Sequence, residues 1–60
     1  MNEFKRVRKL NSLTQAEMAY VLGISHSHYT KLEGNFVNPS FEVLQNFKQI
    51  FKNDMNNFFM

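Results

Sequence analysis

Residues 13–33 read LTQAEMAYVLGISHSHYTKLE and carry the start and stop signals of two short helices. Thr14 followed three residues later by Glu17 is a capping box, in which each side chain bonds the other residue's backbone N–H at a helix N-terminus. Gly23 permits the positive φ of a tight turn, and the Ser25 hydroxyl caps the helix that follows. The stretch therefore predicts one helix after Thr14, a turn at Gly23, and a second helix from Ser25 to the end of the stretch.

Apolar residues in this stretch recur at the spacing of helix faces. In the first of the two helices, the predicted apolar face consists of Met18, Ala19, Val21 and Leu22. The second helix is anchored by Tyr29 and Leu32, three residues apart, and reaches about Glu33. Ile24, between the two helices, is expected to enter the core.

A further helix is predicted on the N-terminal side. It runs from about Asn2 to Asn11, and its apolar residues follow one another at intervals of three: Phe4, Val7 and Leu10. This interval predicts one apolar stripe along the helix.

Two more helices are predicted after residue 33. The loop before them contains Gly34, Asn35, Asn38 and Pro39. Ser40 caps the fourth helix, and the predicted apolar stripe of that helix consists of Phe41, Leu44, Phe47 and Phe51. A last short helix is capped by Asn53 or Asp54 and carries Met55 and Phe58.

Length and composition fit one all-α domain over residues 1–60. Five helices with short loops predict a compact five-helix bundle, and no stretch sustains β alternation. A chain of this size buries only about 60% of the surface that its unfolded form exposes, so its core must be filled efficiently. Seven Phe, two Tyr and four Met supply large side chains for that core, and the lack of cysteine excludes disulfides and thiolate zinc sites.

Charge and hydropathy narrow the classes of function. The net charge is +2, and four of the seven cations fall in one segment, as Lys5, Arg6, Arg8 and Lys9. Composition alone leaves open whether this segment is a solvated helix face or a site for a polyanion. No apolar run approaches the ~20 residues that cross a bilayer, and the N-terminus lacks a signal-peptide core. We therefore expect a cytoplasmic location and no membrane partner.

Catalysis and cofactor binding find no support in the residues. His26 and His28 stand two apart, on different sides of a helix, so they cannot chelate one metal ion together. There is no glycine-rich phosphate loop, and no carboxylate pair is spaced for acid–base chemistry. We therefore expect no enzyme activity, no cofactor and no metal site.

The same stretch resembles the Cro/repressor-type helix-turn-helix family, also called the XRE family. The shared features are the L-T-Q opening, Ala19 where two helices approach closely, Gly23 at the turn, Ile24 after it, the K-L-E ending, N-P-S at residues 38–40, and the apolar Phe58-Phe59. The resemblance implies a lambda-repressor-like bundle. It also implies a transcriptional regulator, expected to be a repressor, that binds double-stranded DNA as a homodimer.

The resemblance further implies which residues of the third helix contact DNA. That helix enters the major groove with its N-terminal residues facing the base edges. Its outer side is polar and has no acid before the final glutamate; it carries Ser25, His26, Ser27, His28, Thr30 and Lys31. Of these, His26, Ser27 and Lys31 are the expected base readers. His28 and Thr30 are expected to contact phosphates or bases, with a surface role as the alternative for His28.

Residues outside the third helix receive roles from the same resemblance. Gln15, in the first turn of the second helix, is expected to hold a phosphate with nearby backbone N–H groups and to brace the third helix, and a solvent-facing Gln is the alternative. Three cations are expected to attract the DNA backbone: Lys5, Arg6 and Lys9. Arg8 is expected to pair with Glu33 inside the protein, which weakens the basic patch.

The chain departs from the family at three places. Asn35 stands where the family often has a glycine, and asparagine tolerates the left-handed conformation needed there. Phe36 and Val37 occupy positions that are commonly basic or polar; they can pack on DNA sugars, meet a second protein or fold inward. Lys48 and Lys52 replace Ala and Gly, so the fifth helix is expected to begin differently.

Other functions are left open by the residues. The chain can be the DNA-binding half of a toxin–antitoxin pair, or the N-terminal part of a longer regulator with a further C-terminal domain. It can also be an adaptor whose helical face binds protein, which is favoured if Phe36 and Val37 are exposed beside the aromatic C-terminus. Phe58 and Phe59 are the expected contact of the homodimer.

Overall fold

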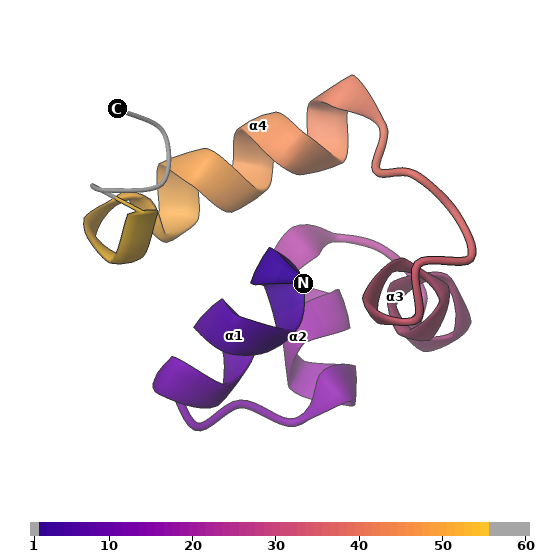
Figure 1. Cartoon of the computed structure of the whole chain (residues 1–60), viewed down its shortest axis with the longest axis horizontal. Helices are drawn as coiled ribbons and strands as arrows, with labels where there is room; N and C mark the ends of the chain where they lie inside the picture. The colour runs from indigo at the N-terminus through magenta and orange to yellow at the C-terminus, as the bar shows by residue number, and fades with distance from the viewer. Residues whose placement is uncertain (1, 56–60) are drawn as a thin grey trace.

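The computed structural model describes residues 2–55, and this part of the chain is all-α (Figure 1). Its elements are α1 (Glu3–Leu10), α2 (Gln15–Leu22), α3 (His26–Glu33), α4 (Phe41–Ile50) and the 3-10 helix η1 (Lys52–Met55). The all-α prediction is confirmed. Of the five predicted helices, four are α-helices; the fifth is represented in the described residues by a 3-10 helix, and its remaining predicted residues lie outside them.

The C-terminal end of the described chain differs from the sequence prediction in a specific way. The N–H of Asp54 donates to the carbonyl of Phe51 at 2.9 Å, an i to i+3 bond that tightens the backbone into a 3-10 turn. This turn begins at Lys52, earlier than the predicted cap at Asn53 or Asp54. The predicted apolar residue Phe58 lies outside the described residues.

The N-termini of the four α-helices are capped by side chains. The capping residues are Asn2, Thr14, Ser25 and Ser40, and each accepts a hydrogen bond from a backbone N–H in the first turn of its helix. Thr14 and Glu17 form both bonds of the predicted capping box. The caps predicted at Thr14, Ser25 and Ser40 are confirmed, because each oxygen satisfies an N–H that has no partner within the helix.

Three helices end in the same way, on a residue with a left-handed backbone. These residues are Ser12 (φ 55°), Gly23 (φ 72°) and Asn35 (φ 63°), and they follow α1, α2 and α3. The N–H of the next residue then bonds a carbonyl five residues back, at 3.1, 3.0 and 2.9 Å respectively. This is the Schellman motif. The turns at Gly23 and Asn35 are as predicted, whereas Ser12 has no side-chain feature that predicts this conformation.

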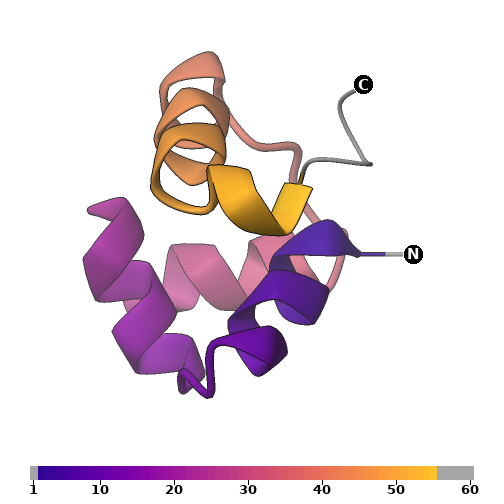
Figure 2. The same cartoon turned by 90° about the vertical axis from the view of Figure 1, so that its left-hand side faces the viewer.

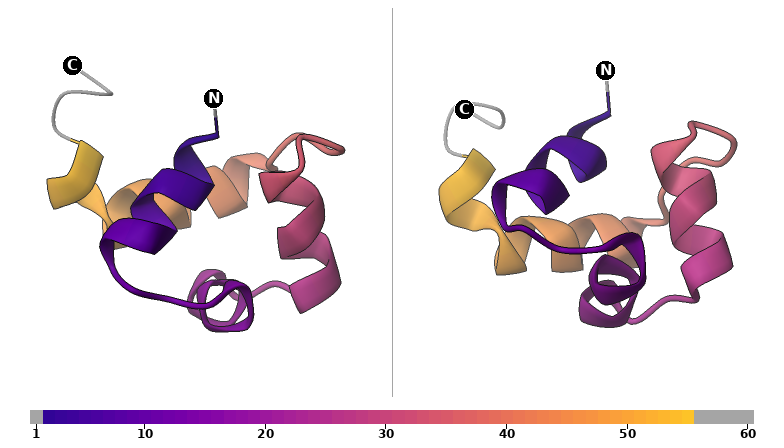
Figure 3. Two further views of the ribbon diagram at one scale, coloured as in Figure 1. Left: turned by 60° about the horizontal axis from the view of Figure 1, so that its bottom comes forward. Right: turned by 90° about the horizontal axis from the view of Figure 1, so that it is seen from below.

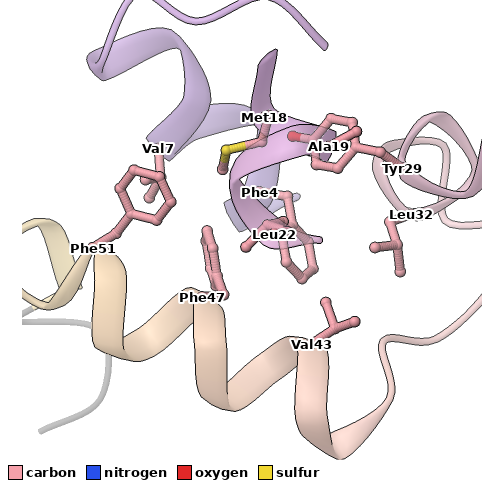
Figure 4. Close-up of a cluster of buried hydrophobic side chains, with 10 residues drawn as sticks. All are labelled: Phe4, Val7, Met18, Ala19, Leu22, Tyr29, Leu32, Val43, Phe47 and Phe51. Atoms are coloured by element: carbon pink, nitrogen blue, oxygen red, sulfur yellow. The ribbon is translucent and has the colours of Figure 1, made fainter. Parts of the chain in front are cut away.

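One apolar core joins the four α-helices, and Figure 4 shows its ten buried side chains. They are Phe4, Val7, Met18, Ala19, Leu22, Tyr29, Leu32, Val43, Phe47 and Phe51. Phe4 lies at the centre of the aromatic residues: its ring centroid is 4.3 Å from that of Phe47 and 6.4 Å from that of Tyr29. Ile24 packs against this core as predicted.

Three residues predicted to face the core are exposed instead. Leu10 is 60% exposed, Phe41 is 77% exposed and Val21 is 37% exposed. Leu10 follows Phe4 by six residues, and Phe41 precedes Phe47 by six. At 100° per residue this spacing rotates a side chain 120° away from the stripe. In α4 the buried position is taken by Val43, four residues before Phe47.

The helices lie on two sides of the core. In Figures 1 and 2, α4 and η1 are on one side, and α1, α2 and α3 are on the other. Both views of Figure 3 place α3 at one edge of the molecule, after the turn that joins it to α2. No other described helix covers the outer side of α3, and the fold therefore presents that side to solvent.

Candidate nucleic-acid interface

The outer side of α3 is polar and exposed. Ser27 and Lys31 are exposed and Thr30 is partly exposed, whereas Tyr29 and Leu32 on the inner side are buried. At 100° per residue, the first three side chains share one face, directly opposite the two buried ones. The structure thus brings together three of the residues predicted to contact DNA.

The remaining predicted residues of α3 flank this face. His26 is exposed on one flank and His28 is partly exposed on the other, as their spacing of two residues requires. Ser25 is exposed at the N-cap, where its Oγ accepts from the N–H of His28 at 3.0 Å. The Ser25 hydroxyl hydrogen is not used by this bond, so this residue can still donate to a ligand.

Thr30 is restricted by a local hydrogen bond. Its Oγ1 donates to the backbone carbonyl of Ser27 at 2.8 Å. A hydroxyl has one hydrogen, so in this rotamer Thr30 can only accept from a ligand. A phosphate has no hydrogen to offer at neutral pH, whereas adenine and cytosine present amino groups in the major groove. The predicted contact of Thr30 with a phosphate or a base stays a prediction.

The inner end of α3 is organised around the carboxylate of Glu33. Arg8 donates to it through Nε at 2.6 Å and Nη2 at 3.3 Å, and Gln15 donates to Oε1 at 3.1 Å. The hydroxyl of Tyr29 also donates to Oε2. The side chains of Arg8 and Glu33 are only 13% and 6% exposed, so this ion pair is shielded from water. The structure thus brings Arg8 and Glu33 together, and Arg8 further donates to the carbonyl of Leu13 at 2.9 Å.

The electrostatics of this network keep each group in its ordinary charge state. Burial by itself raises the pKa of Glu33, but the hydrogen bonds from Arg8, Tyr29 and Gln15 outweigh it, and the pKa lies below its usual value. The hydrogen bond to Glu33 raises the pKa of Arg8. Burial, followed by the bond to Glu33, raises the pKa of Tyr29. At neutral pH the single acid of α3 is therefore ionised and neutralised internally.

Gln15 contacts the third helix, as the family resemblance implies, through a partner, Glu33, that the sequence did not identify. Because one of its amide hydrogens is directed to Glu33, Gln15 ties the start of α2 to the end of α3. Its second hydrogen and the first backbone N–H groups of α2, which have no acceptor within the helix, remain suited to an anion. The predicted phosphate contact at Gln15 stays a prediction.

The cations of α1 divide into two kinds. Arg6 donates to the carboxylate of Glu3 and to the carbonyl of Asp54 at 3.0 Å, so its charge is paired within the protein, although its side chain is 40% exposed. Its attraction of the DNA backbone stays a prediction. The hydrogen bond with Glu3 raises the pKa of Arg6. Lys5 and Lys9 are exposed and lie one helical turn apart, on the flank of α1 next to Arg8.

Asn2 is a positioning residue that the sequence reasoning missed. Its Oδ1 accepts from the N–H of Lys5 at 3.2 Å and caps α1. Its Nδ2 donates to the carbonyls of Leu32 and Glu33 at 2.8 and 3.1 Å, and to Oδ1 of Asn35 at 3.0 Å. One amide group therefore caps the start of α1 and the end of α3. Its identity as a helix cap was readable from the sequence, but its partners near the end of α3 lie 30 to 33 positions away.

The two apolar residues after α3 do not fold into the core. Phe36 is 81% exposed and Val37 is 38% exposed, so the inward alternative is wrong for Phe36. Val37 lines a shallow hollow together with Leu44 and Phe47. Phe36 remains available for contact with another molecule.

Two further findings concern other classes of site. Within residues 2–55, no helix combines the length and apolar character that crossing a membrane requires. In the same range, no three side chains of the His, Asp or Glu type gather where a metal ion would be held.

Comparison with known protein families places this geometry in context. Residues 4–52 match the helix-turn-helix family of the Cro/repressor type, a match that runs from α1 to the first residue of η1. Comparisons with curated proteins and with solved structures returned no significant match. The family is non-catalytic, and its presence implies DNA binding, typically in a transcriptional regulator.

Proposed function

The chain belongs to the Cro/repressor-type helix-turn-helix family, and from this premise we propose that it is a sequence-specific repressor that binds double-stranded DNA as a homodimer. The observation that carries the proposal is the outer face of α3. This face is uncovered, rich in hydrogen-bonding groups, and free of uncompensated negative charge, because Arg8 neutralises Glu33. Such a helix suits a groove lined by phosphates.

The dimensions of α3 match the major groove. An α-helix with its side chains is about 10–12 Å across, and the major groove is about 12 Å wide, so the groove admits a helix such as α3. Three side chains on its exposed surface offer different chemistry to base edges: His26, Ser27 and Lys31. Lys31 donates to guanine O6 or N7, Ser27 donates or accepts, and His26 presents a ring nitrogen.

Residues around α3 are proposed to hold the DNA without reading it. Gln15 and the first N–H groups of α2 would contact one phosphate, and Lys5 and Lys9 would attract the backbone from α1. Ser25 and His28 complete the set at the N-terminal turn of α3. Contacts of this kind set affinity and register but carry no base preference.

Homodimeric binding follows from the small size of one reading helix. A single helix contacts three or four base pairs, which discriminates poorly among genomic sites, whereas a two-fold dimer reads two half-sites about 10 base pairs apart. The contact proposed from the sequence, Phe58 and Phe59, lies outside the described residues.

Selection of bound sites from random DNA tests the proposal directly. The expected result is one recurrent motif with inverted symmetry, and sedimentation with two chains per duplex. Lys31→Ala should weaken binding to that motif by roughly 1–3 kcal/mol and relax the choice at one base pair. Lys9→Ala, the matched control, should weaken all sequences alike and lower the salt slope by up to about one unit. No recurrent motif, or one unchanged in Lys31→Ala, would refute α3 as the reading helix.

A protein-binding adaptor is the second candidate function, and the exposed aromatic residues favour it. Phe36 and Phe41 are 81% and 77% exposed, so both rings are accessible to a protein partner. A gel-shift assay with random DNA distinguishes the two candidates, because an adaptor leaves DNA mobility unchanged. A DNA-binding antitoxin would shift DNA as a repressor does, and would differ only in also binding a toxin protein.

A further inference from the structure

Gly34 continues the outer face of α3. It follows Ser27 by seven residues and Thr30 by four, a spacing that places all three positions on one side of a helix. Its backbone is still right-handed, with φ at −82°, so the position belongs geometrically to the end of the helix. A glycine contributes no side chain there, and the surface at this point is made by another residue.

The ring of Phe36 fills the place of the missing side chain. A methyl group built on Gly34 would lie only 2.7 Å from two ring carbons of Phe36, Cδ2 and Cε2. The chain reaches this position through the left-handed residue Asn35, and the N–H of Phe36 bonds the carbonyl of Lys31 at 2.9 Å. The Schellman turn therefore folds the ring back over the C-terminal end of α3, where it is 81% exposed.

The ring lies on the same face of α3 as Ser27. Gly34 is seven residues, about 10 Å along the helix axis, from Ser27, so DNA that contacts Ser27 and Lys31 passes over the ring or close beside it. The surfaces there with apolar character are deoxyribose C–H groups and thymine methyl groups. A second protein bound to the ring would cover part of the same face as Ser27 and Lys31.

We propose that Phe36 is a DNA-contacting residue, which packs its ring on an apolar C–H surface of the DNA. The proposal rests on the proposed DNA-binding function and assigns to this chain an uncharged contact where a basic residue is common in its family. Gly34 is the position that makes room for the ring.

This contact has a recognisable signature, because it releases no counterions. Phe36→Ala should weaken binding to the selected site about tenfold, as expected for loss of a partly buried aromatic ring, and should leave the slope of affinity against salt unchanged. Phe36→Lys should instead steepen the slope by about one unit. Phe41→Ala is the matched control, since Phe41 is equally large and 77% exposed but lies on α4, and it should bind as wild type.

A double-mutant cycle tests the place of the ring as well as its presence. Gly34→Ala keeps the phenyl group but pushes it off the face of α3, so it should weaken DNA binding severalfold. In the Phe36→Ala background the added methyl has nothing to displace, and Gly34→Ala should then have no further effect. Thermal unfolding should change little in each variant, because the ring is mostly solvated.

Replacement of each thymine of the site by deoxyuridine distinguishes the two apolar surfaces. Loss of affinity at one position, in wild type but not in Phe36→Ala, identifies a thymine methyl. No loss at any position, together with the tenfold effect of Phe36→Ala, identifies deoxyribose.

Wild-type affinity in Phe36→Ala overturns this inference alone, as does weakened self-association of that variant without DNA. Failure of the wild type to select any DNA overturns the proposed function as well.

Discussion

The two ends of α3 are held in different ways. At the C-terminal end, Glu33 receives hydrogen bonds from Arg8, Gln15 and Tyr29, and Asn2 caps the last carbonyls. At the N-terminal end, the side-chain bonds that the structure shows are local: the Ser25 hydroxyl caps the helix, and the Thr30 hydroxyl donates to the carbonyl of Ser27. The helix is therefore anchored at the end remote from most of its proposed base readers, so stability and recognition depend on different residues.

The largest expected effect comes from removing the anchor. Glu33→Ala leaves the Arg8 guanidinium shielded from water without a counterion, and should lower the free energy of unfolding by about 3 kcal/mol. Replacing both residues by apolar ones, as in Arg8→Met with Glu33→Leu, should cost much less. Urea unfolding monitored by circular dichroism measures both. An unchanged melting temperature in Glu33→Ala would show that the pair does not anchor α3.

A smaller loss is expected from the Asn2 amide. Asn2→Ala removes the cap of α1 and the bonds to the end of α3, and should cost about 1–2 kcal/mol. Asn2→Asp keeps an oxygen that caps α1 but loses the donor to the carbonyls, so it should recover only part of the loss. If Asn2→Asp is as stable as wild type, the link from α1 to α3 contributes nothing.

The pH dependence of the free energy of unfolding should show the contribution of Glu33 at the C-terminal end of α3. The folded pKa of Glu33 lies below its unfolded value, so its contribution is fully present above the unfolded pKa of about 4.3 and is lost as the pH falls through the folded pKa. Because burial opposes the hydrogen bonds, we expect this loss to be modest. Unfolding at pH 7 to 3 should show a shallower decline for Glu33→Gln than for wild type, and parallel curves would contradict the assignment.

The smallest effect on stability is expected at the N-terminal end. His26→Ala and Ser27→Ala remove exposed side chains and should change the free energy of unfolding by less than about 0.5 kcal/mol. The same variants should alter base preference in selection from random DNA. A loss of stability comparable with that of Glu33→Ala would show that the N-terminal end of α3 contributes as much to stability as the C-terminal end.

Much of the fold could be read from local signals. The caps at Thr14, Ser25 and Ser40 and the turn at Gly23 are short-range features, because each partner lies within a few residues and depends only on backbone conformation. The error at Leu10 was also local, because six residues of helix rotate its side chain 120° away from Phe4.

The candidate site also has parts that local sequence signals predicted and parts that they did not. The polar face of α3 follows from helical spacing, so Ser27 and Lys31 were found together from the sequence. Arg6 and Arg8 look alike in the sequence, and only the packed structure shows that one binds Glu3 and Asp54 while the other binds Glu33. Family resemblance pointed to the pairing with Glu33. Glu3 stands three residues before Arg6, a helical spacing that itself favours an ion pair, whereas no local pattern pointed to the contact with Asp54.

The sequence by itself therefore determined the helices, most of their caps and the polar character of α3, since these depend on contacts within one or two turns of chain. Tertiary structure decided the rest: the capping of α3 by Asn2, the Gln15 bond to Glu33, and the outward ring of Phe36 over Gly34. The reason is physical. The partner that a side chain bonds or packs against is set by which residues the fold brings within contact distance. Separation along the sequence does not show which residues those are.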